Sequence, residues 1–274
     1  MPDSTSGLTL MAVHAHPDDE ASTTGGILAR YADEGVRTVL VTCTRGELGD
    51  GPGGVKPGEA GHDETAVAAT RLGELEASCA ILGVSALEML GYHDSGMAGW
   101  PQNDAPGSFW STPVEEPAAR LAALVEHYRP QVVVTYDDNG FYGHPDHIQA
   151  HRITVAALAT TSSASKLYCP AIPRSAIGRF ASVFAEEGAD APPAEEFDSI
   201  STPDELVTTY VDCSAFVARK RAALAAHASQ MDNAFFLRLD DERFAQVFGV
   251  ESFVRLSDTT GASVPEDDLF AGAR

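Results

Sequence analysis

Short apolar runs alternate with segments of helical periodicity over the first half of the chain, and this alternation limits the possible folds more than any other feature. Four runs have the length and the β-branched or continuously apolar character of buried strands. These runs are "LTLMAVHA" (8–15), "RTVLVTCT" (37–44), "ALEMLGY" (86–92) and "QVVVTYD" (131–137). The segments between them, such as "ETAVAATRLGELEASCAILG", carry apolar residues at helical spacing and end at glycine or proline. Repeated strand–helix–strand units predict parallel strands joined by right-handed crossovers.

The predicted fold is therefore α/β, a Rossmann-like three-layer αβα sandwich with a mainly parallel sheet. Beyond about residue 162 the pattern is less regular. "KLYCPAI" and "TTYVDC" have strand character, while "PRSAIGRFASVFAEEG" and "SAFVARKRAALAAHASQ" have helical character, with Ser214 as a candidate N-cap. The Pro-rich and acidic segment 189–205 is expected to be a surface loop.

No linker and no internal repeat divides the chain, so we predict a single catalytic domain over residues 1–274. Its core is expected over 8–162 and further elements over 163–256. The polar segment 257–274 is expected to be a mobile tail.

The charge of the chain excludes several classes of partner. Its 40 acidic and 18 basic residues give a net charge of −22, which repels phosphate backbones and anionic lipid headgroups. We therefore expect no nucleic-acid partner. No apolar run reaches the ~18 residues of a membrane span, and "MPDSTSG" lacks the features of a signal peptide, so no membrane insertion is expected. The widely spaced cysteines (Cys43, Cys79, Cys169 and Cys213) are expected to be buried thiols of a cytoplasmic protein.

Polar loops follow each of the four predicted strands at the point where the strand ends. "HAHPDDE" (14–20) follows the first strand, and "YGHPDH" (142–147) follows the fourth. The Gly- and Pro-rich segments "TRGELGDGPGGVKPGEAGHDE" and "HDSGMAGWPQNDAPGSFWST" follow the second and third strands and are longer than ordinary connections. Ligands bind outside the carboxyl ends of the strands in such sheets. The four loops therefore predict one functional edge.

The two His-Pro-Asp phrases predict a metal site at this edge. Proline suits the first position of a helix, and residues three apart share one helical face. His16, Asp19 and His147 can then converge on one cation. Two imidazoles, one carboxylate and an open position make a catalytic zinc site, and iron(II) uses the same ligand set. Acids in a first helical turn also suit the helix dipole, and histidine before proline also occurs in plain turns. The occurrence of the phrase at two strand ends favours the metal site.

Residues beside these ligands have the chemistry needed to hydrolyse an amide with a metal-activated water. Asp18 is placed to act as the general base. His144, as an imidazolium, could stabilise an oxyanion or protonate a leaving amine. Asp146 could hydrogen-bond an imidazole and fix its tautomer.

These phrases, together with "VTCTRGELG", "TRLGELEASCAILGV", "HDSGMAG" and "VVVTYDDNGFYGHPDH", resemble the motifs of the PIG-L/LmbE-like family of zinc-dependent N-acetylglucosaminyl deacetylases over residues 8 to about 160. The resemblance implies a Rossmann-like fold and removal of acetate from an acetamide on glucosamine. It implies a zinc ion held by His16, Asp19 and His147. It also implies Asp18 as base and His144 as acid or oxyanion stabiliser.

The resemblance extends to candidate substrate contacts. It implies that Arg71 and Asp94 hold sugar hydroxyls and that Tyr142 hydrogen-bonds the tetrahedral intermediate. A helix-surface arginine, a turn aspartate and a packed strand-end aromatic are the structural alternatives. Glu47 either lines the sugar site or faces solvent. His227 and Gln230 could reach the pocket from a helix end. We expect His14 to pack under the site.

Three substrate classes occur in the family: the N-acetylglucosaminyl-inositol precursor of mycothiol, mycothiol conjugates, and teicoplanin-type glycopeptides. Trp100, Phe109 and Trp110 offer aromatic surface for a sugar or an aglycone, although Phe109 also suits the core of a lid. The Gly-rich loop differs from our expectation for the mycothiol-precursor enzyme. We therefore expect a small-molecule glycoconjugate of antibiotic biosynthesis, such as a teicoplanin-type glycopeptide. Deacetylation of the mycothiol precursor, or cleavage of mycothiol conjugates by an amidase, is the alternative.

Two other functional classes fit the sequence less well. A nucleotide-binding protein of this fold would carry G-x-G-x-x-G after the first strand, where this chain has "HPDDE" with two adjacent carboxylates that would repel a pyrophosphate. A non-catalytic carbohydrate-binding module needs neither a base such as Asp18 nor an acid such as His144.

Overall fold

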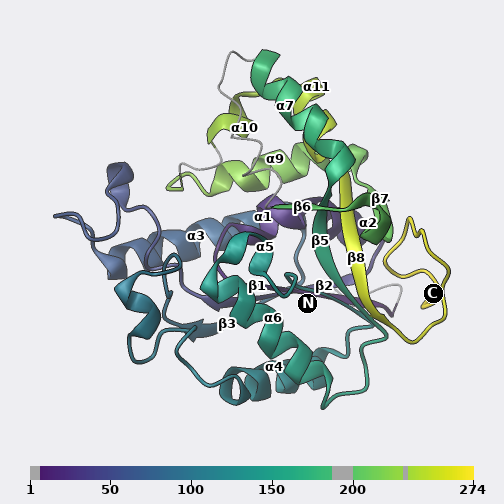
Figure 1. Ribbon diagram of the computed structural model, residues 1–274, viewed down its shortest axis with the longest axis horizontal. Helices are drawn as coiled ribbons and strands as arrows, with labels where there is room; N and C mark the ends of the chain where they lie inside the picture. The colour runs from purple at the N-terminus through teal and green to yellow at the C-terminus, as the bar shows by residue number, and fades with distance from the viewer. Residues whose placement is uncertain (1–6, 187–199, 231–233) are drawn as a thin grey trace.

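The computed structural model describes residues 7–186, 200–230 and 234–274 (Figure 1). Within these ranges one sheet holds eight strands in the order β3-β2-β1-β4-β5-β8-β7, with β6 paired to β5. The strands are β1 (Thr9–His14), β2 (Arg37–Thr44), β3 (Ala86–Tyr92), β4 (Val132–Val134), β5 (Lys166–Pro173), β6 (Ser201–Thr202), β7 (Thr209–Asp212) and β8 (Val250–Asp258). The second and third predicted strands match β2 and β3 in both bounds.

Helices cover both faces of the sheet. On one face lie α2 (Gly25–Asp33), α3 (Glu64–Leu82) and α9 (Val217–Ala226), and on the other lie α4 (Glu115–Tyr128) and α6 (Pro145–Leu158), as Figure 1 shows. The remaining α-helices are α1 (Asp19–Thr23), α5 (Gly140–Gly143), α7 (Ile177–Glu186), α10 (Ala234–Arg238) and α11 (Asp241–Phe248). The predicted three-layer αβα fold is confirmed.

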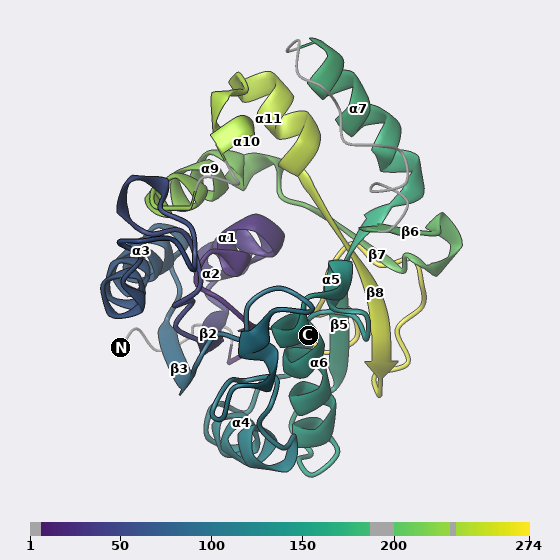
Figure 2. The same ribbon diagram turned by 60° about the vertical axis from the view of Figure 1, so that its left-hand side comes forward.

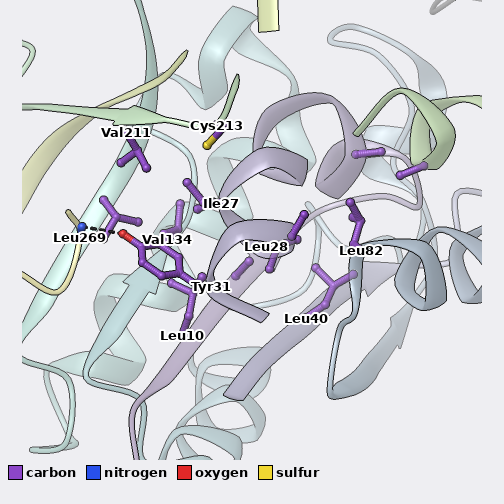
Figure 3. Packing of buried hydrophobic residues seen from close by; sticks show 14 of the residues in the cluster. Leu10, Ile27, Leu28, Tyr31, Leu40, Leu82, Val134, Val211, Cys213 and Leu269 are labelled. Carbon is purple, nitrogen blue, oxygen red and sulfur yellow. Dashed lines mark hydrogen bonds between the residues drawn. The ribbon is translucent and has the colours of Figure 1, made fainter. Parts of the chain in front are cut away.

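Side chains on the central strands alternate between two cores. Leu10 and Ala12 of β1 pack among residues of α2, α3 and α9, whereas Met11 and Val13 pack among residues of α4 and α6. This period of two explains why positions 10–13 of the strand are all apolar, since a sheet with helices on both faces has no solvated side. Figure 3 shows the first core, in which Tyr31 of α2 lies fully buried.

The strands β1 to β5 pair in parallel, and β8 pairs antiparallel to both β5 and β7. The prediction of a mainly parallel sheet is therefore confirmed. In Figure 2, β5, β8 and β7 lie together on one side of the sheet and β2 and β3 on the other. The strand β8 comes from a part of the chain for which no strand was predicted.

The segment after β8 was expected to be a mobile tail, but it is docked on the core. Leu269 and Phe270 are fully buried in the first core. The backbone N–H of Leu269 donates to the hydroxyl of Tyr31 at 2.8 Å (Figure 3). That hydroxyl donates to Asp268. A polar segment is thus docked by two apolar side chains and one tyrosine hydroxyl.

Two smaller expectations concern Ser214 and the loop over 189–205. Ser214 lies in a 3₁₀ turn before α9, and its side chain does not cap this helix. Most of the loop expected over 189–205 lies outside the described residues, and its last part holds β6 and a short 3₁₀ turn.

All four cysteines are buried. None of the described helices is long and apolar enough to cross a bilayer.

Candidate metal centre

The two His-Pro-Asp turns meet where the strand order reverses. β1 and β4 are neighbours, the chain passes from β1 to β2 on one side, and it passes from β4 to β5 on the other. His16 lies in the turn between β1 and α1, and α1 begins at Asp19 with Asp18 as its N-cap, so Pro17 does not take the first helical position as expected. His144 is the N-cap of α6 beyond β4, and Pro145 does take that position. A crevice at the carboxyl ends of such strands is the usual ligand site of an open parallel sheet. The fold thus brings together the turns that the sequence analysis singled out.

The side chains of His16, Asp19 and His147 form a compact donor set. One ligand atom from each lies within 4.8 Å of the others, and all three residues are buried. The Nδ1 atom of His16 is 3.4 Å from Asp19 Oδ2, and the Nε2 atom of His147 is 3.5 Å from Asp19 Oδ1. Neither ring nitrogen of His147 has a hydrogen-bond partner within the part of the chain that the structure describes. Two imidazoles, one carboxylate and an unsatisfied buried nitrogen fit a divalent cation such as Zn²⁺ or Fe²⁺.

The charge states of His147 and Asp19 suit a metal ion. Burial lowers the pKa of His147 to about 4, so its imidazole is neutral at pH 7. Burial opposes ionisation of Asp19, but His147 and His16 hold its pKa well below the usual value. Neutral imidazole and ionised carboxylate are the forms that bind metals.

Asp146 orients the ring of His16. The Oδ2 atom of Asp146 is 3.2 Å from His16 Nε2 and accepts the backbone N–H of Ser95 at 2.9 Å. This contact occupies Nε2 of His16 and leaves its Nδ1 facing Asp19. Asp146 therefore lies where it could fix the tautomer of His16, as predicted. Burial lowers the pKa of His16, but the carboxylates of Asp94, Asp146 and Asp19 raise it well above its usual value.

His144 is close to the same centre but is held differently. His16, His144 and Asp146 also form a possible donor group. However, the Nδ1 atom of His144 already accepts the backbone N–H of Asp146 at 3.1 Å. Burial and the neighbouring imidazoles of His16 and His147 lower the pKa of His144 to about 2. His144 therefore offers a neutral Nε2–H donor, rather than the imidazolium expected from the sequence.

Asp18 has a strained backbone at the entrance of α1. Its φ of 112° and ψ of −28° lie in the left-handed region, which costs a non-glycine residue about 1–3 kcal/mol and persists only where the surroundings enforce it. Its carboxylate accepts from Arg71 Nη2 at 3.0 Å. Partial burial raises the pKa of Asp18 to about 6, with Arg71 opposing and Asp19 adding to the rise. A carboxyl group with this pKa suits general-base chemistry near neutral pH.

Arg71 is buried against the backbone of two loops. Only 4% of its surface is exposed. Besides Asp18, its guanidinium donates to the carbonyls of Pro17 and Gly46, the latter at 2.9 Å. A Cβ at Gly46 would lie 2.3 Å from Arg71 Nη1, and φ is +66° there, so this position of the loop requires glycine. These contacts give Nη1 and Nη2 of Arg71, a residue expected to hold sugar hydroxyls, partners within the chain.

The loops after β2 and β3 interlock through the carboxylates of Glu47 and Asp94. The backbone N–H of Asp94 donates to Glu47 Oε2 at 3.1 Å, and that of Leu48 donates to Asp94 Oδ2 at 3.3 Å. Both acids are buried, so Glu47 does not face solvent. Asp94 Oδ1 lies 3.7 Å from His16 Nε2, which joins these loops to the donor set.

The aromatic residues of the loop after β3 separate into two groups. Phe109 is fully buried and stacks on Tyr92 with ring centroids 5.3 Å apart, as in the lid-core alternative. Trp100 is partly buried and covers Gly96, where a Cβ would lie 2.5 Å from Trp100 Cε3. Trp110, also partly buried, lies under the guanidinium of Arg152 at 4.7 Å.

Tyr142 lies beside His144 and His147. It follows Phe141 in the short helix α5, where Phe141 has a non-helical φ of 67°. Of the surface of Tyr142, 46% is exposed. Its ring centroid lies 5.1 Å from that of His147 and 6.0 Å from that of His144. The hydroxyl is thus carried by an exposed ring beside the donor set.

Two buried residues of the site were not predicted from the sequence. Tyr136 stacks on His147 with centroids 4.0 Å apart, and its hydroxyl accepts the backbone N–H of Ala15 at 2.9 Å. Glu20 is fully buried beneath Asp18. A tyrosine at the end of a strand and an acid in a first helical turn carry no sequence signal that distinguishes them from ordinary core and capping residues. His14 packs under the site as expected, bonded to the hydroxyl of Thr24 at 2.8 Å.

Comparison with known proteins gives a consistent result. The family model "PIG-L: GlcNAc-PI de-N-acetylase" matches residues 11–158. The chain is similar to a protein of Acidothermus cellulolyticus named 1D-myo-inositol 2-acetamido-2-deoxy-alpha-D-glucopyranoside deacetylase, with 44% identity over 277 residues covering 96% of this chain and 94% of that protein. A protein of the same name from Thermobifida fusca is 45% identical over 285 residues, covering 96% and 98%.

The fold is also similar to a solved structure of a deacetylase from the biosynthesis pathway of teicoplanin. The TM-score is 0.60 at 20% identity, with 92% of this chain and 99% of that chain covered. At this identity the similarity concerns the fold alone.

Proposed function

The chain belongs to the PIG-L family, and we propose that it is a metal-dependent hydrolase that removes the acetyl group from a 2-acetamido-2-deoxyglucose unit joined to myo-inositol. The observation that supports this proposal most directly is the convergence of His16, Asp19 and His147 within 4.8 Å beside Asp18. Three ligands next to a carboxyl group of raised pKa are the elements that hydrolysis of an amide by water requires.

His16 Nδ1, an oxygen of Asp19 and His147 Nε2 would hold the ion. Zinc is proposed as the metal, with iron(II) as the alternative. When bound, such an ion supplies Lewis acidity, which makes water more acidic and polarises a carbonyl group. The remaining chemistry falls to the side chains around it.

Asp18 takes the proton of the water that attacks the acetyl carbon. The C–N bond of the tetrahedral intermediate then breaks, and the same proton passes from Asp18 to the departing nitrogen, so that acetate and a free amine leave. The Nε2–H of His144 donates to the developing oxyanion, as a preorganised neutral donor does. The hydroxyl of Tyr142 is proposed as a second donor to this oxyanion because its ring lies beside both histidines.

The sugar is proposed to lie against the loops after β2 and β3. Asp94 and Glu47 occupy the inner part of this wall and Trp100 its outer part. The role proposed for Arg71 changes, because three of its contacts are to Pro17, Asp18 and Gly46. We propose that it supports the catalytic turn and reaches the substrate only through the loop that it holds.

The choice of substrate follows the relatives of high identity. The glycopeptide expected from the sequence is supported only by structural similarity at 20% identity. The two relatives named as inositol-glycoside deacetylases are 44% and 45% identical over nearly the whole chain. These values favour the alternative of the sequence analysis, the N-acetylglucosaminyl-inositol precursor of mycothiol.

A release assay with purified, metal-loaded enzyme tests the proposal. Acetate and primary amine are measured with the N-acetylglucosaminyl-inositol glycoside, a mycothiol conjugate and an N-acetylglucosaminyl glycopeptide, each with Zn²⁺ and with Fe²⁺. We expect equal amounts of acetate and amine, and the highest kcat/KM for the inositol glycoside. A higher kcat/KM for the glycopeptide would contradict the proposed substrate, and no acetate from any compound would contradict the proposed reaction.

A further inference from the structure

Glu20 is a fully buried carboxylate that the proposed reaction does not use. Its Oε2 atom accepts the backbone N–H of Asp18 at 3.0 Å. Its Oε1 atom accepts from the hydroxyl of Ser78 and from His227 Nε2, the latter at 2.7 Å. A buried charge is maintained only where its lone pairs find donors. Glu20 has three donors, and one of them is the peptide of the proposed general base.

His227 reaches Glu20 from a distant part of the chain. It lies at the C-terminal end of α9, 207 residues beyond Glu20, and is 1% exposed. Because a carboxylate can only accept, Nε2 of His227 must carry a proton in this contact. His227 was expected as a residue that could reach the substrate pocket, but its Nε2 contacts Glu20 instead.

The residues that follow His227 fasten the same segment to other elements of the site. The backbone and hydroxyl of Ser229 both donate to Glu74 of α3, at 2.8 and 2.7 Å. The side-chain amide of Gln230 bonds the backbone of Asp50 in the loop after β2, as acceptor at 3.2 Å and as donor at 3.3 Å. The position of the His227 ring is therefore set by several contacts.

Asp18 needs such support because its backbone is in the left-handed region. Its carbonyl accepts from Ala21 and Ser22 in α1, both at 3.1 Å, and its carboxylate accepts from Arg71. Glu20 supplies the contact to the remaining polar group, the N–H. Without that contact the Asp18 peptide loses its partner, and an ordinary φ would turn the carboxylate away from its present position.

On the basis of the proposed function, we infer that Glu20 and His227 are positioning residues for Asp18. The His227–Glu20 pair holds the Asp18 N–H and thereby keeps the carboxylate of the general base beside the metal ligands. Neither residue touches the substrate. Their effect on turnover passes through Asp18 alone.

Kinetics of the zinc-loaded full chain test this inference with the glycoside that gives acetate in the release assay. We expect His227→Ala and Glu20→Gln to lower kcat by ~10–100-fold, the usual effect of removing an outer-shell partner. KM should change little and zinc should stay stoichiometric. His227→Gln keeps a neutral N–H donor and should recover most of the loss. Glu266→Gln, which alters a buried carboxylate bonded to Lys166 and Tyr168, is the control and should keep the wild-type kcat.

A double-mutant cycle separates positioning from general damage. In the Asp18→Asn background, His227→Ala should cause no further loss, because the group that it positions no longer acts as a base. Losses that multiply in the double variant would overturn the inference, and so would wild-type kcat in His227→Ala. Should that variant not fold, Glu20→Gln takes its place in the cycle.

A crystal structure of the zinc-loaded His227→Ala variant gives a readout that does not need turnover. We expect Asp18 to leave the left-handed region or its Oδ2 to lose Arg71 Nη2. An unchanged Asp18 would overturn the inference. A wild-type enzyme that releases no acetate would contradict the proposed function instead, and the crystal structure would then decide the positioning role.

Discussion

The guanidinium of Arg71 lies 3.0 Å from the carboxylate of Asp18, from Nη2 to Oδ2, although 53 residues separate the two in sequence. Arg71 comes from the buried face of α3, so this contact joins α3 directly to the turn between β1 and α1. A positive charge at this distance lowers the pKa of a carboxyl group. It therefore opposes the rise to about 6 that burial causes at Asp18.

Arg71→Met should move the acid limb of the kcat/KM profile to higher pH. Removing the positive charge raises the pKa of Asp18 further, so the ionised base is lost at a higher pH than in the wild type. A bound cation lowers the pKa of Asp18 in both enzymes, so the difference between their profiles is the quantity to measure. Arg37→Met, which removes a guanidinium packed on Tyr128, should leave the limb in place. A shift to lower pH would contradict the assignment of the base.

Asp18→Asn should lose at least ~100-fold in kcat, the lower range for a general base, while zinc binding is retained. Asparagine tolerates the left-handed backbone of this position, so the change removes the base and little else. Acetate release and metal content are measured together. Asp33→Asn on the exposed side of α2 is the matched control and should behave as wild type. Full activity in Asp18→Asn would exclude this residue as the base.

His147→Ala should abolish stoichiometric metal binding, because one of three protein ligands is removed. Metal content after desalting measures this effect, with the exposed His127→Ala of α4 as the control. Zinc retained at one equivalent would show that His147 is not a ligand.

Asp146→Asn should weaken metal affinity by ~10–100-fold without abolishing it, since Asp146 orients His16 through Nε2. Titration against a competing chelator measures the affinity. An unchanged affinity would mean that the Asp146–His16 contact does not support the metal site.

Phe270→Ala should destabilise the protein by about 3–5 kcal/mol, the usual cost of truncating a buried phenylalanine. Phe270 is fully buried against Tyr31, with ring centroids 5.1 Å apart. Denaturant unfolding measures the change, and Leu256→Ala, at a residue 43% exposed, should stay within about 0.5 kcal/mol of wild type. Equal stability of both variants would mean that the segment beyond β8 adds little to the fold.

The parallel part of the sheet could be predicted because burial on both faces makes the central positions of its strands mainly apolar. β8 could not be predicted in the same way. Its sequence "VESFVRLSD" mixes buried Phe253 with exposed Leu256, and its pairing depends on β5, which lies far away in sequence. The docking of the segment after β8 could not be predicted either, because a few apolar side chains in a polar segment give no periodic signal.

The donor set of His16, Asp19 and His147 could be predicted because both His-Pro-Asp phrases follow predicted parallel strands, whose carboxyl ends meet at one edge of the sheet. His16 and Asp19 are three residues apart where the chain enters α1, and Pro145 begins the helix that carries His147. The supporting residues depend on how distant helices pack. Nothing in the sequence of α3 or α9 indicates that Arg71 would face Asp18 or that His227 would face Glu20, because those contacts arise only once the helices are placed on the sheet.

The antiparallel β8 lies between β5 and β7, and β7 pairs with no other long strand of the described sheet. During synthesis β5 leaves the ribosome long before β8, so the backbone along one side of β5 stays unpaired while the N-terminal strands can already assemble. An open strand edge is a template for association with other chains. The nascent protein is therefore most exposed to aggregation in the interval between translation of residues 173 and 258, when chaperone binding should protect it most.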